Sequence, residues 1–147
     1  MYIRNLEEND YKQWLSLWQG YQKFYQTTLN EGVTKTTFAR FLDPNEPMFC
    51  KVMQDGQQLV GLVHFIFHRS TWSQGNYCYL QDLFVHENTR GQKVGQQLIE
   101  AVYQVANEAE CSRVYWLTHE DNLSARKLYD QVAQNAGFIQ YRKNLNM

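Results

Sequence analysis

Hydrophobic residues recur with two different periods along this chain, and the period changes near residue 48. Before that point apolar residues return at steps of three and four, as in Trp14, Leu17 and Tyr21, which is typical of an amphipathic helix. Between residues 48 and 85, runs rich in aromatic and β-branched residues are separated by turn signals such as Asp55-Gly56, which is typical of antiparallel strands. After residue 90 the helical period returns twice, and each time a short apolar run follows.

This pattern predicts the element order β-α-α-β-β-β-α-β-α-β. The order is typical of a mixed α/β (α+β) fold, with a central, mostly antiparallel sheet flanked by helices and a strand–helix–strand crossover in the second half. Because 147 residues is the size of one domain, we expect a single domain over residues 1–147. Strands are expected at 2–6, 48–53, 59–67, 77–85, 113–118 and 138–142, and helices at about 10–25, from 34 or 36 to 42, 94–109 and 122–133.

Composition and charge narrow the possible partners and compartment. The hydrophobic share of 44% is enough for a core and excludes bulk disorder. A net charge of -1 argues against a protein that binds along a nucleic-acid backbone. Three widely spaced cysteines without a CxxC pair argue against disulfides, and neither a leader nor a membrane-length apolar run is visible. We therefore expect a cytoplasmic protein with no nucleic-acid or membrane partner.

The segment richest in chemistry runs from a predicted strand into a glycine-containing helix start. Gly91 and Gly95 stand there, with Arg90 and Lys93 beside them. A helix N-terminus presents unpaired N–H groups and a partial positive charge, so it can hold a phosphate, and glycine lets the backbone approach a ligand closely. On the residues alone, an ordinary helix start with solvated cations is an equal alternative.

The span from Leu80 to Gly95 resembles the acetyl-CoA-binding motif of the GNAT superfamily of N-acetyltransferases, whose signature is Arg/Gln-x-x-Gly-x-Gly/Ala. Arg90 and Gly95 match the ends of the signature, whereas Lys93 stands where the family has its first glycine. Lys93 either contacts a phosphate or changes the path of the loop. The segment from 122 to 129 resembles a later family segment in which an Asn and a Tyr contact coenzyme A. Within the superfamily, the chain looks most like the histone and polyamine acetyltransferases and their bacterial relatives.

The resemblance implies the GNAT fold over essentially the whole chain, acetyl-CoA as co-substrate and N-acetyltransferase activity. In this family the strand before the glycine segment bulges, here near Leu83–Val85, and its free N–H groups face the thioester carbonyl. The resemblance also implies that Tyr129 is the general acid that protonates the leaving thiolate. The residues implied in cofactor binding are Leu83, Phe84, Val85, Arg90, Gly91, Gln92, Lys93, Val94, Gly95, Gln96, Asn122, Ala125 and Tyr129.

Several groups are candidates for the general base. An alkyl ammonium, with a pKa near ~10.4, must lose a proton before its nitrogen can attack. Asp82, a carboxylate in an apolar strand just before the expected bulge, is the first candidate. Glu120, Asp121 and a relay through water are the alternatives. Gln81 stands where polyamine acetyltransferases carry a glutamate, and an amide cannot act as a base.

The acceptor is expected to bind between the first two helices and the central hairpin, where aromatic side chains suit an alkyl stem and a cationic head. These features predict acetyl transfer to a primary amine of a small molecule, a polyamine or an amino-acid derivative. Acetylation of a protein lysine or N-terminus, and a non-catalytic CoA-binding sensor, are the alternatives. The substrate-binding candidates are Tyr25, Glu31, Trp72, Gln81 and Glu120.

Two further expectations concern metals and assembly. His64 and His68 share one face of a predicted strand, but a spacing of four separates them by roughly 13 Å, too far for one zinc ion. We therefore expect no metal. An exposed last strand at 138–142 would be able to pair with a second copy of the chain, which predicts a homodimer.

Overall fold

The computed structural model describes residues 1–89 and 91–146. The chain forms two compact units, Met1–Leu117 and Thr118–Met147. The first unit contains the sheet and the helices that pack on it, and the second contains α4 (Leu123–Val132). The single domain expected over residues 1–147 stays a prediction.

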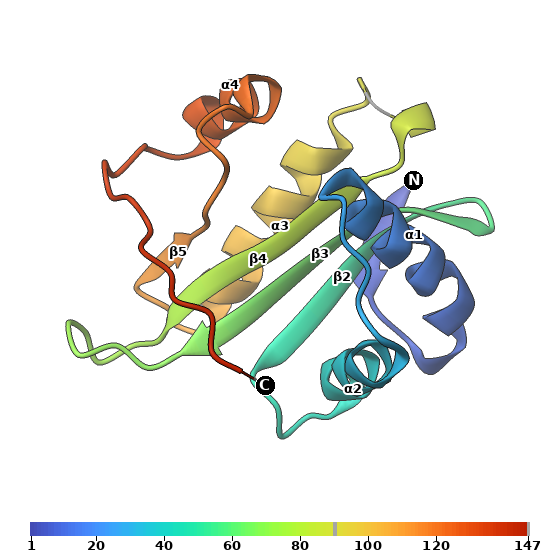
Figure 1. Cartoon of the computed structure of the whole chain (residues 1–147), viewed down its shortest axis with the longest axis horizontal. Helices are drawn as coiled ribbons and strands as arrows, with labels where there is room; N and C mark the ends of the chain where they lie inside the picture. The colour runs from blue at the N-terminus through green and yellow to red at the C-terminus, as the bar shows by residue number, and fades with distance from the viewer. Residues whose placement is uncertain (90, 147) are drawn as a thin grey trace. The chain divides into compact units, whose positions relative to one another are not determined.

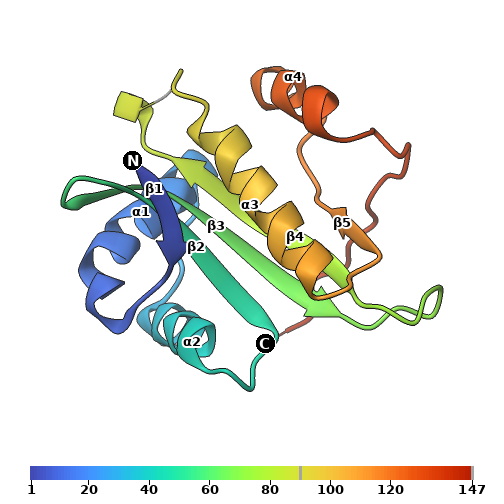
Figure 2. The same cartoon turned by 180° about the vertical axis from the view of Figure 1, so that it is seen from behind.

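Five strands form one sheet in the order β1-β2-β3-β4-β5 (Figures 1 and 2). Neighbouring strands from β1 to β4 are antiparallel, and β5 runs parallel to β4. The mixed, mostly antiparallel sheet predicted from the sequence is therefore confirmed. The strands are β1 Tyr2–Asn5, β2 Met48–Asp55, β3 Gln58–His68, β4 Tyr77–Val85 and β5 Arg113–Tyr115.

Helices cover both faces of the sheet in the first unit. α1 (Tyr11–Phe24) and α2 (Glu31–Leu42) lie on the face turned toward the viewer in Figure 1. α3 (Val94–Glu108) lies on the opposite face, seen from the front in Figure 2. Short 3-10 turns, η1 (Glu8–Asp10) and η2 (Glu87–Thr89), precede α1 and follow β4.

Hydrophobic burial holds these layers together. On the first face, Trp14 of α1 is fully buried and packs with Leu17 against Leu62 of β3. On the second face, α3 buries Leu98 and Val102 completely. Each such side chain contributes about 1.5–3 kcal/mol when it is fully buried. The apolar steps of three and four in the sequence are therefore the steps that face the sheet.

Two predicted boundaries were wrong. α2 begins at Glu31, because the side-chain oxygen of Asn30 accepts the N–H of Val33 at 2.8 Å and caps the helix there. Thr34, expected as the cap, lies inside the helix and donates its hydroxyl to the Asn30 carbonyl at 3.0 Å. Strand β5 is also shorter than the expected 113–118 and ends at Tyr115.

The final strand expected at 138–142 is not formed, so the predicted element order was wrong in its last member. The apolar side chains of this segment bury little, since Phe138 and Tyr141 are each 90% exposed. A strand needs a neighbour that satisfies its N–H and C=O groups. Among residues 118–146, the structure has no other strand to serve as that neighbour.

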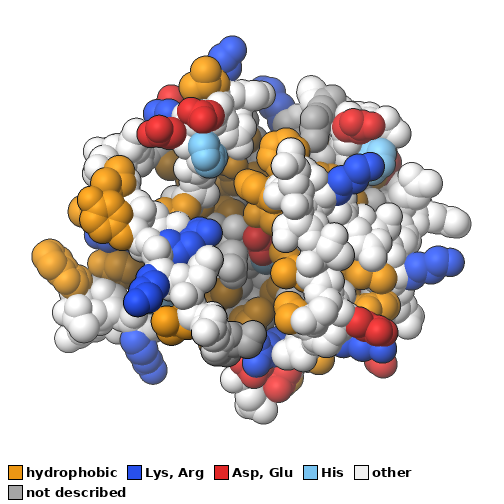
Figure 3. Space-filling model, viewed as in Figure 1, with side chains coloured by type: hydrophobic (Ala, Val, Ile, Leu, Met, Phe, Trp, Pro, Cys, Tyr) orange, Lys and Arg blue, Asp and Glu red, His pale blue; other side chains and the backbone are white. Residues whose placement is uncertain are grey.

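Figure 3 shows the face of the molecule on which α1 and α2 lie. Over these helices, hydrophobic side chains appear between polar ones, and those with large exposed fractions include Phe24, Tyr25 and Val33.

Within the described part of the chain, no helix combines the length and the apolar character that a membrane crossing requires.

Candidate active site

A β-bulge in β4 shapes the centre of the site. The register with β3 runs through Phe65↔Leu80 and resumes at His64↔Asp82, so Gln81 is the extra, unpaired residue. The bulge lies at Gln81, not near Leu83–Val85 as the resemblance implied. The extra residue gives Asp82 the same sheet face as His64, toward α1.

Beyond the bulge, alternate N–H groups of β4 point away from β3. His86 donates its N–H to Val60 at 2.8 Å, which makes these two residues a hydrogen-bonded pair. Because such pairs alternate along an antiparallel ladder, the N–H groups of Leu83 and Val85 point toward the outer edge and that of Phe84 points toward β3. β5 pairs with β4 only as far as Tyr79. Two of the three predicted N–H groups are therefore directed to that edge.

The Phe84 side chain fixes α1 against β4. Its ring lies edge-on to Tyr21 at a centroid distance of 6.4 Å. A Cβ added at Gly20 would lie 3.0 Å from the tip of the Phe84 ring, so α1 approaches β4 closely where it has no side chain. Phe84 therefore acts in this structure as a packing residue.

Asp82 belongs to a chain of three side chains from three elements of the first unit. Its Oδ2 lies 3.0 Å from Nδ1 of His64, and Nε2 of His64 lies 3.1 Å from the indole nitrogen of Trp14. The His64 side chain is 3% exposed and that of Asp82 is 14% exposed. Burial and the charge of Asp82 raise the pKa of the Tyr21 hydroxyl. Asp82 is thus a largely buried carboxylate that pairs with His64 at the edge of an aromatic core.

The start of α3 offers unpaired backbone donors. Lys93, the residue before the helix, has a left-handed backbone with φ 60° and provides no side-chain cap. The first helical bond runs from the N–H of Gln97 to the carbonyl of Lys93, which leaves the N–H groups of Val94, Gly95 and Gln96 without an intrahelical acceptor.

The loop before α3 leaves room beside this helix end. Gly91 has φ +88°, and a Cβ added there would meet nothing within 4 Å. Lys93 adds an exposed cation next to the free N–H groups. The first turn of α3 therefore fits an anionic group such as a pyrophosphate. Arg90, predicted to bind the same group, lies outside the described residues.

The second unit carries the other predicted contacts to coenzyme A on α4. Ala125 and Tyr129 are four residues apart in α4, which places them on one face of the helix, and Asn122 directly precedes the helix as its N-cap. All three residues are half-buried. The side-chain amide of Asn122 lies 3.5 Å from the hydroxyl of Thr118. Glu120 is exposed, and its backbone carbonyl accepts a hydrogen bond from Arg126 at 2.8 Å.

The predicted acceptor residues of the first unit do not come together. Tyr25 packs on Tyr21 at a centroid distance of 4.9 Å, close to Phe84 at the end of β4. Trp72 is 89% exposed and lies before Tyr77, the first residue of β4. Tyr25 lies near Phe84, at the other end of this strand, and the seven residue steps from Tyr77 to Phe84 span roughly 23 Å. Trp72 and Tyr25 therefore do not line one small pocket.

The other two candidates from this unit are exposed. Glu31 lies in the first turn of α2 and forms an exposed ion pair with Lys35 at 2.8 Å. Gln81 is exposed at the bulge.

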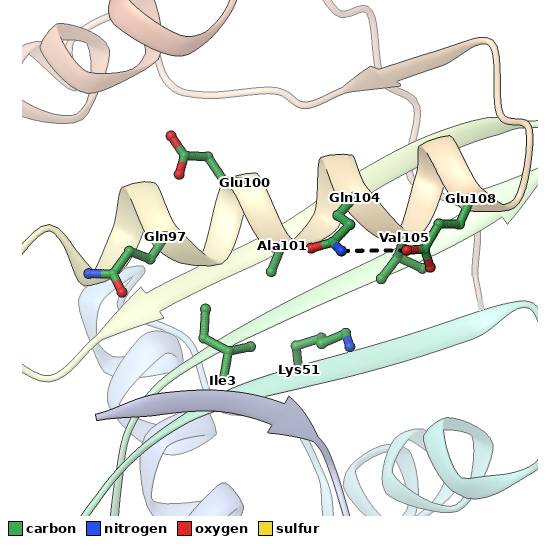
Figure 4. A pocket seen from close by; sticks show the side chains of 8 residues that line it. All are labelled: Ile3, Lys51, Gln97, Glu100, Ala101, Gln104, Val105 and Glu108. Atoms are coloured by element: carbon green, nitrogen blue, oxygen red, sulfur yellow. Dashed lines mark hydrogen bonds between the residues drawn. The ribbon is translucent and has the colours of Figure 1, made fainter.

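A groove of about 400 Å³ lies on the far side of the sheet from Asp82 (Figure 4). Its wall includes Lys51 of β2, whose neighbours Cys50 and Val52 point into the core beneath α1. Figure 4 shows the groove between α3 and the strands β1 and β2. It is therefore separate from the Asp82 site. The lining residues are Ile3, Lys51, Gln97, Glu100, Ala101, Gln104, Val105 and Glu108.

Within residues 1–89 and 91–146, no three His, Cys, Asp or Glu side chains are grouped so that they would hold a metal ion. His68, which the sequence offered as a possible ligand, is engaged by the Tyr115 hydroxyl at 2.7 Å.

The profile of the Acetyltransferase (GNAT) family matches residues 12–133. The chain belongs to the GNAT family of acetyltransferases. It is similar to the D-amino-acid N-acetyltransferase HPA3 of Saccharomyces cerevisiae, with 35% identity over 144 residues that make up 97% of this chain and 89% of the relative. It is also similar to the thialysine N-epsilon-acetyltransferase of Bos taurus, with 34% identity over 58% of this chain and 46% of that protein.

Solved structures agree with this assignment at the level of the fold. A probable acetyltransferase superposes with a TM-score of 0.86 at 20% identity, covering 100% of this chain and 99% of the other. An aminoglycoside acetyltransferase from a soil metagenome, in complex with trehalose, superposes with a TM-score of 0.81 at 20% identity, covering 99% of this chain and 96% of the other. The solved structures thus confirm the GNAT fold expected from the sequence motifs. The family profile and the named relatives confirm the expected acetyltransferase activity.

The GNAT family uses acetyl-CoA, and the start of α3 fits the pyrophosphate of that molecule.

Sequence reasoning missed the partners of Asp82. From the sequence, His64 was considered only as a possible metal ligand, and Trp14 only as a core residue. The signal that was available is a histidine on the buried face of a strand next to a strand that carries a carboxylate.

Proposed function

We propose that this GNAT protein transfers the acetyl group of acetyl-CoA to a primary amine of a small, amino-acid-like molecule. Asp82 carries the proposal, because it is a largely buried carboxylate one residue before the outward-pointing N–H group of Leu83. The substrate class is supported by relatives whose names specify a D-amino acid and thialysine. The similarity to the first of these covers 97% of the chain.

Acetyl-CoA supplies an acetyl group activated as a thioester, and its transfer joins the acetyl carbon to the amine nitrogen and releases the CoA thiol. The chain's own residues have four tasks in this proposal. Asp82 accepts the proton that the acceptor ammonium must lose. The N–H groups of Leu83 and Val85 donate to the acetyl oxygen as it gains negative charge. Tyr129 donates a proton to the departing sulfur.

Binding of the CoA pyrophosphate is the fourth task. We assign it to the free N–H groups of Val94, Gly95 and Gln96 and to the Lys93 ammonium. Gly91 and Gln92 belong to the loop that leads into this helix end, and Arg90 stays a predicted contact. Ala125 shares a face of α4 with Tyr129, and Asn122 caps the start of the same helix, which supports a role for this helix toward CoA.

The substrate class is tested by the release of CoA thiol from acetyl-CoA with a panel of amines. The panel contains D- and L-amino acids, thialysine, spermidine and a lysine-containing peptide. We expect turnover with an amino-acid-like amine that exceeds turnover with the peptide. Preference for the peptide supports the protein-acetylating alternative. Acetyl-CoA binding without any amine-dependent turnover refutes the proposal in favour of a CoA-binding sensor.

The base is tested by Asp82→Asn, with Asp121→Asn as the matched control. Asp121 is a candidate from the sequence, and its side chain is 83% exposed. Loss of a general base lowers kcat by about two to four orders of magnitude, and we expect that loss for Asp82→Asn alone with the KM for acetyl-CoA unchanged. The opposite pattern would transfer the role to Asp121.

We also propose a cytoplasmic homodimer. The support for a dimer is the exposed apolar segment near the C-terminus, in which Ile139 is 78% exposed and Tyr141 is 90% exposed. Equilibrium sedimentation at micromolar concentration tests this proposal. We expect the dimer mass, and a monomer mass alone would exclude the dimer.

A further inference from the structure

His64 occupies the middle of a buried hydrogen-bond chain that joins α1, β3 and β4. It lies 3.1 Å from the Trp14 indole nitrogen on one side and 3.0 Å from the Asp82 carboxylate on the other. Aromatic rings surround it, with Phe41 of α2 at a centroid distance of 4.5 Å and Trp18 of α1 at 4.8 Å. The imidazole therefore has fixed partners at both ring nitrogens and almost no access to water.

The chemistry of the two partners determines the protonation of the ring. An indole N–H can only donate, so Nε2 of His64 must accept with its lone pair. A neutral imidazole with its lone pair on Nε2 carries its hydrogen on Nδ1, and that N–H points at Oδ2 of Asp82. While Trp14 occupies Nε2, His64 has no free lone pair with which to take up a second proton.

We propose that His64 is a positioning residue for acetyl transfer: Trp14 locks it as the neutral Nδ1–H tautomer, and in this form it orients the Asp82 carboxylate but cannot receive its proton. The proposal rests on the role of Asp82 as the general base. Asp82 is then the end of the proton path on the protein side. The accepted proton leaves by the exposed part of the carboxylate, away from His64.

The titratable groups around His64 support this arrangement. Burial, Asp10 and Asp82 raise the pKa of the Cys50 thiol on β2 well above its usual value, so Cys50 is neutral. Burial and Asp82 raise the pKa of the Tyr21 hydroxyl on α1, which is neutral as well. The ring contact that α2 makes with His64 comes from Phe41, which carries no titratable group. Asp82 is therefore the one charge in direct contact with His64 among the described residues.

Nitrogen NMR of the isotope-labelled protein shows which ring nitrogen carries the hydrogen, and this reading does not depend on activity. We expect the His64 ring to show the Nδ1–H pattern, with its lone pair on Nε2. In Trp14→Phe, which keeps a ring but removes the donor to Nε2, we expect the Nε2–H form to appear in the His64 spectrum. A wild-type His64 that carries its hydrogen on Nε2, or hydrogens on both ring nitrogens, overturns the proposal.

Kinetics test whether the bond to Asp82 matters for the reaction. His64→Leu removes the donor and is expected to lower kcat roughly tenfold with an unchanged KM for acetyl-CoA, whereas His64→Asn supplies an amide N–H and is expected to recover most of the loss. Equal activity of the Leu and Asn variants overturns the positioning role. Trp14→Phe adds a test that does not depend on His64→Leu folding, because it leaves His64 in place and removes the donor that fixes its tautomer. Its kcat should fall with an unchanged KM for acetyl-CoA, and a kcat equal to that of the wild type overturns the lock by Trp14.

The two proposals fail in different ways. Full activity of Asp82→Asn overturns the base role, and with it the catalytic purpose of the His64 bond, even where the NMR spectrum shows the Nδ1–H tautomer. An inactive Asp82→Asn together with an Nε2–H tautomer overturns only the role assigned to His64.

Discussion

Asp82 and its partners depend on α1, and Asp10 ties the start of that helix to the sheet. Both Asp10 oxygens accept hydrogen bonds from the Arg4 guanidinium of β1 at 2.8 Å, and Oδ2 also accepts the N–H of Glu7 at 2.7 Å. The Asp10 side chain is 8% exposed and that of Arg4 is 21% exposed. Asp10→Asn removes the negative charge and replaces one accepting oxygen with an amide NH2, which faces the N–H donors of Arg4 and Glu7. The substitution therefore breaks an ion pair that has little access to water.

The structure sets the size of the loss. Breaking a fully buried ion pair by removal of one partner costs about 3–5 kcal/mol. Water recovers part of this cost, because the Arg4 side chain is partly exposed. We therefore expect Asp10→Asn to lower the free energy of unfolding by about 2–3 kcal/mol at neutral pH, measured by urea denaturation.

A matched control uses the exposed pair of Glu31 with Lys35, and we expect Glu31→Gln to leave stability unchanged within error. The pH dependence supplies the second test. The hydrogen bonds from Arg4 lower the pKa of Asp10, so this group stabilises the fold above the unfolded-state pKa of about 3.9. That contribution is lost as pH falls through the lower, folded-state pKa. The difference between wild type and Asp10→Asn should therefore shrink in that acidic range, and a loss below about 1 kcal/mol at neutral pH would refute the reasoning.

Three further changes test the catalytic and cofactor assignments. Tyr129→Phe should lower kcat much more than the affinity for acetyl-CoA, and equal losses in kinetics and in calorimetric binding would count against an acid role. Gly95→Asp should weaken CoA binding, measured by calorimetry, because it adds a negative charge at the helix end assigned to the pyrophosphate; the fold should tolerate it, since acidic residues suit a helix N-terminus. Gly20→Ala should add about 1 kcal/mol of helix stability only when Phe84→Leu removes the ring that the new Cβ would meet at 3.0 Å. A gain of that size in the wild-type background, measured by urea denaturation, would show that the Phe84 ring moves freely.

The parts of the fold that depend on local chemistry could be predicted from the sequence. Trp14 and Leu17 fall on the buried face of α1 because helical spacing alone decides which side chains share a face. The strand expected at 138–142 is not formed, because a strand depends on more than its own sequence. Alternating apolar residues indicate that a segment is able to form a strand, but only a neighbouring strand makes it one.

The candidate site also contains residues that the sequence could predict and contacts that it could not. Lys93 and Gly95 could be placed at a helix start because the motif is continuous in sequence, and the structure starts α3 there. The bonds around His64 could not be predicted, since Trp14 lies 50 residues away in sequence and Asp82 lies 18 residues away. Only the packing of α1 on the sheet brings these three side chains together.

One unpaired residue decides which side chain of β4 meets His64. If the register that runs through Phe65↔Leu80 continued without a bulge, His64 would face Gln81. Asp82 would then point toward α3, whose buried side chains are apolar, and an unpaired carboxylate there would cost several kcal/mol. The bulge at Gln81 instead turns Asp82 toward His64, because a shift of one residue moves every later side chain to the other face of the sheet. The extra residue therefore places the carboxylate beside a polar partner, and strict alternation along β4 would have assigned it to the wrong face.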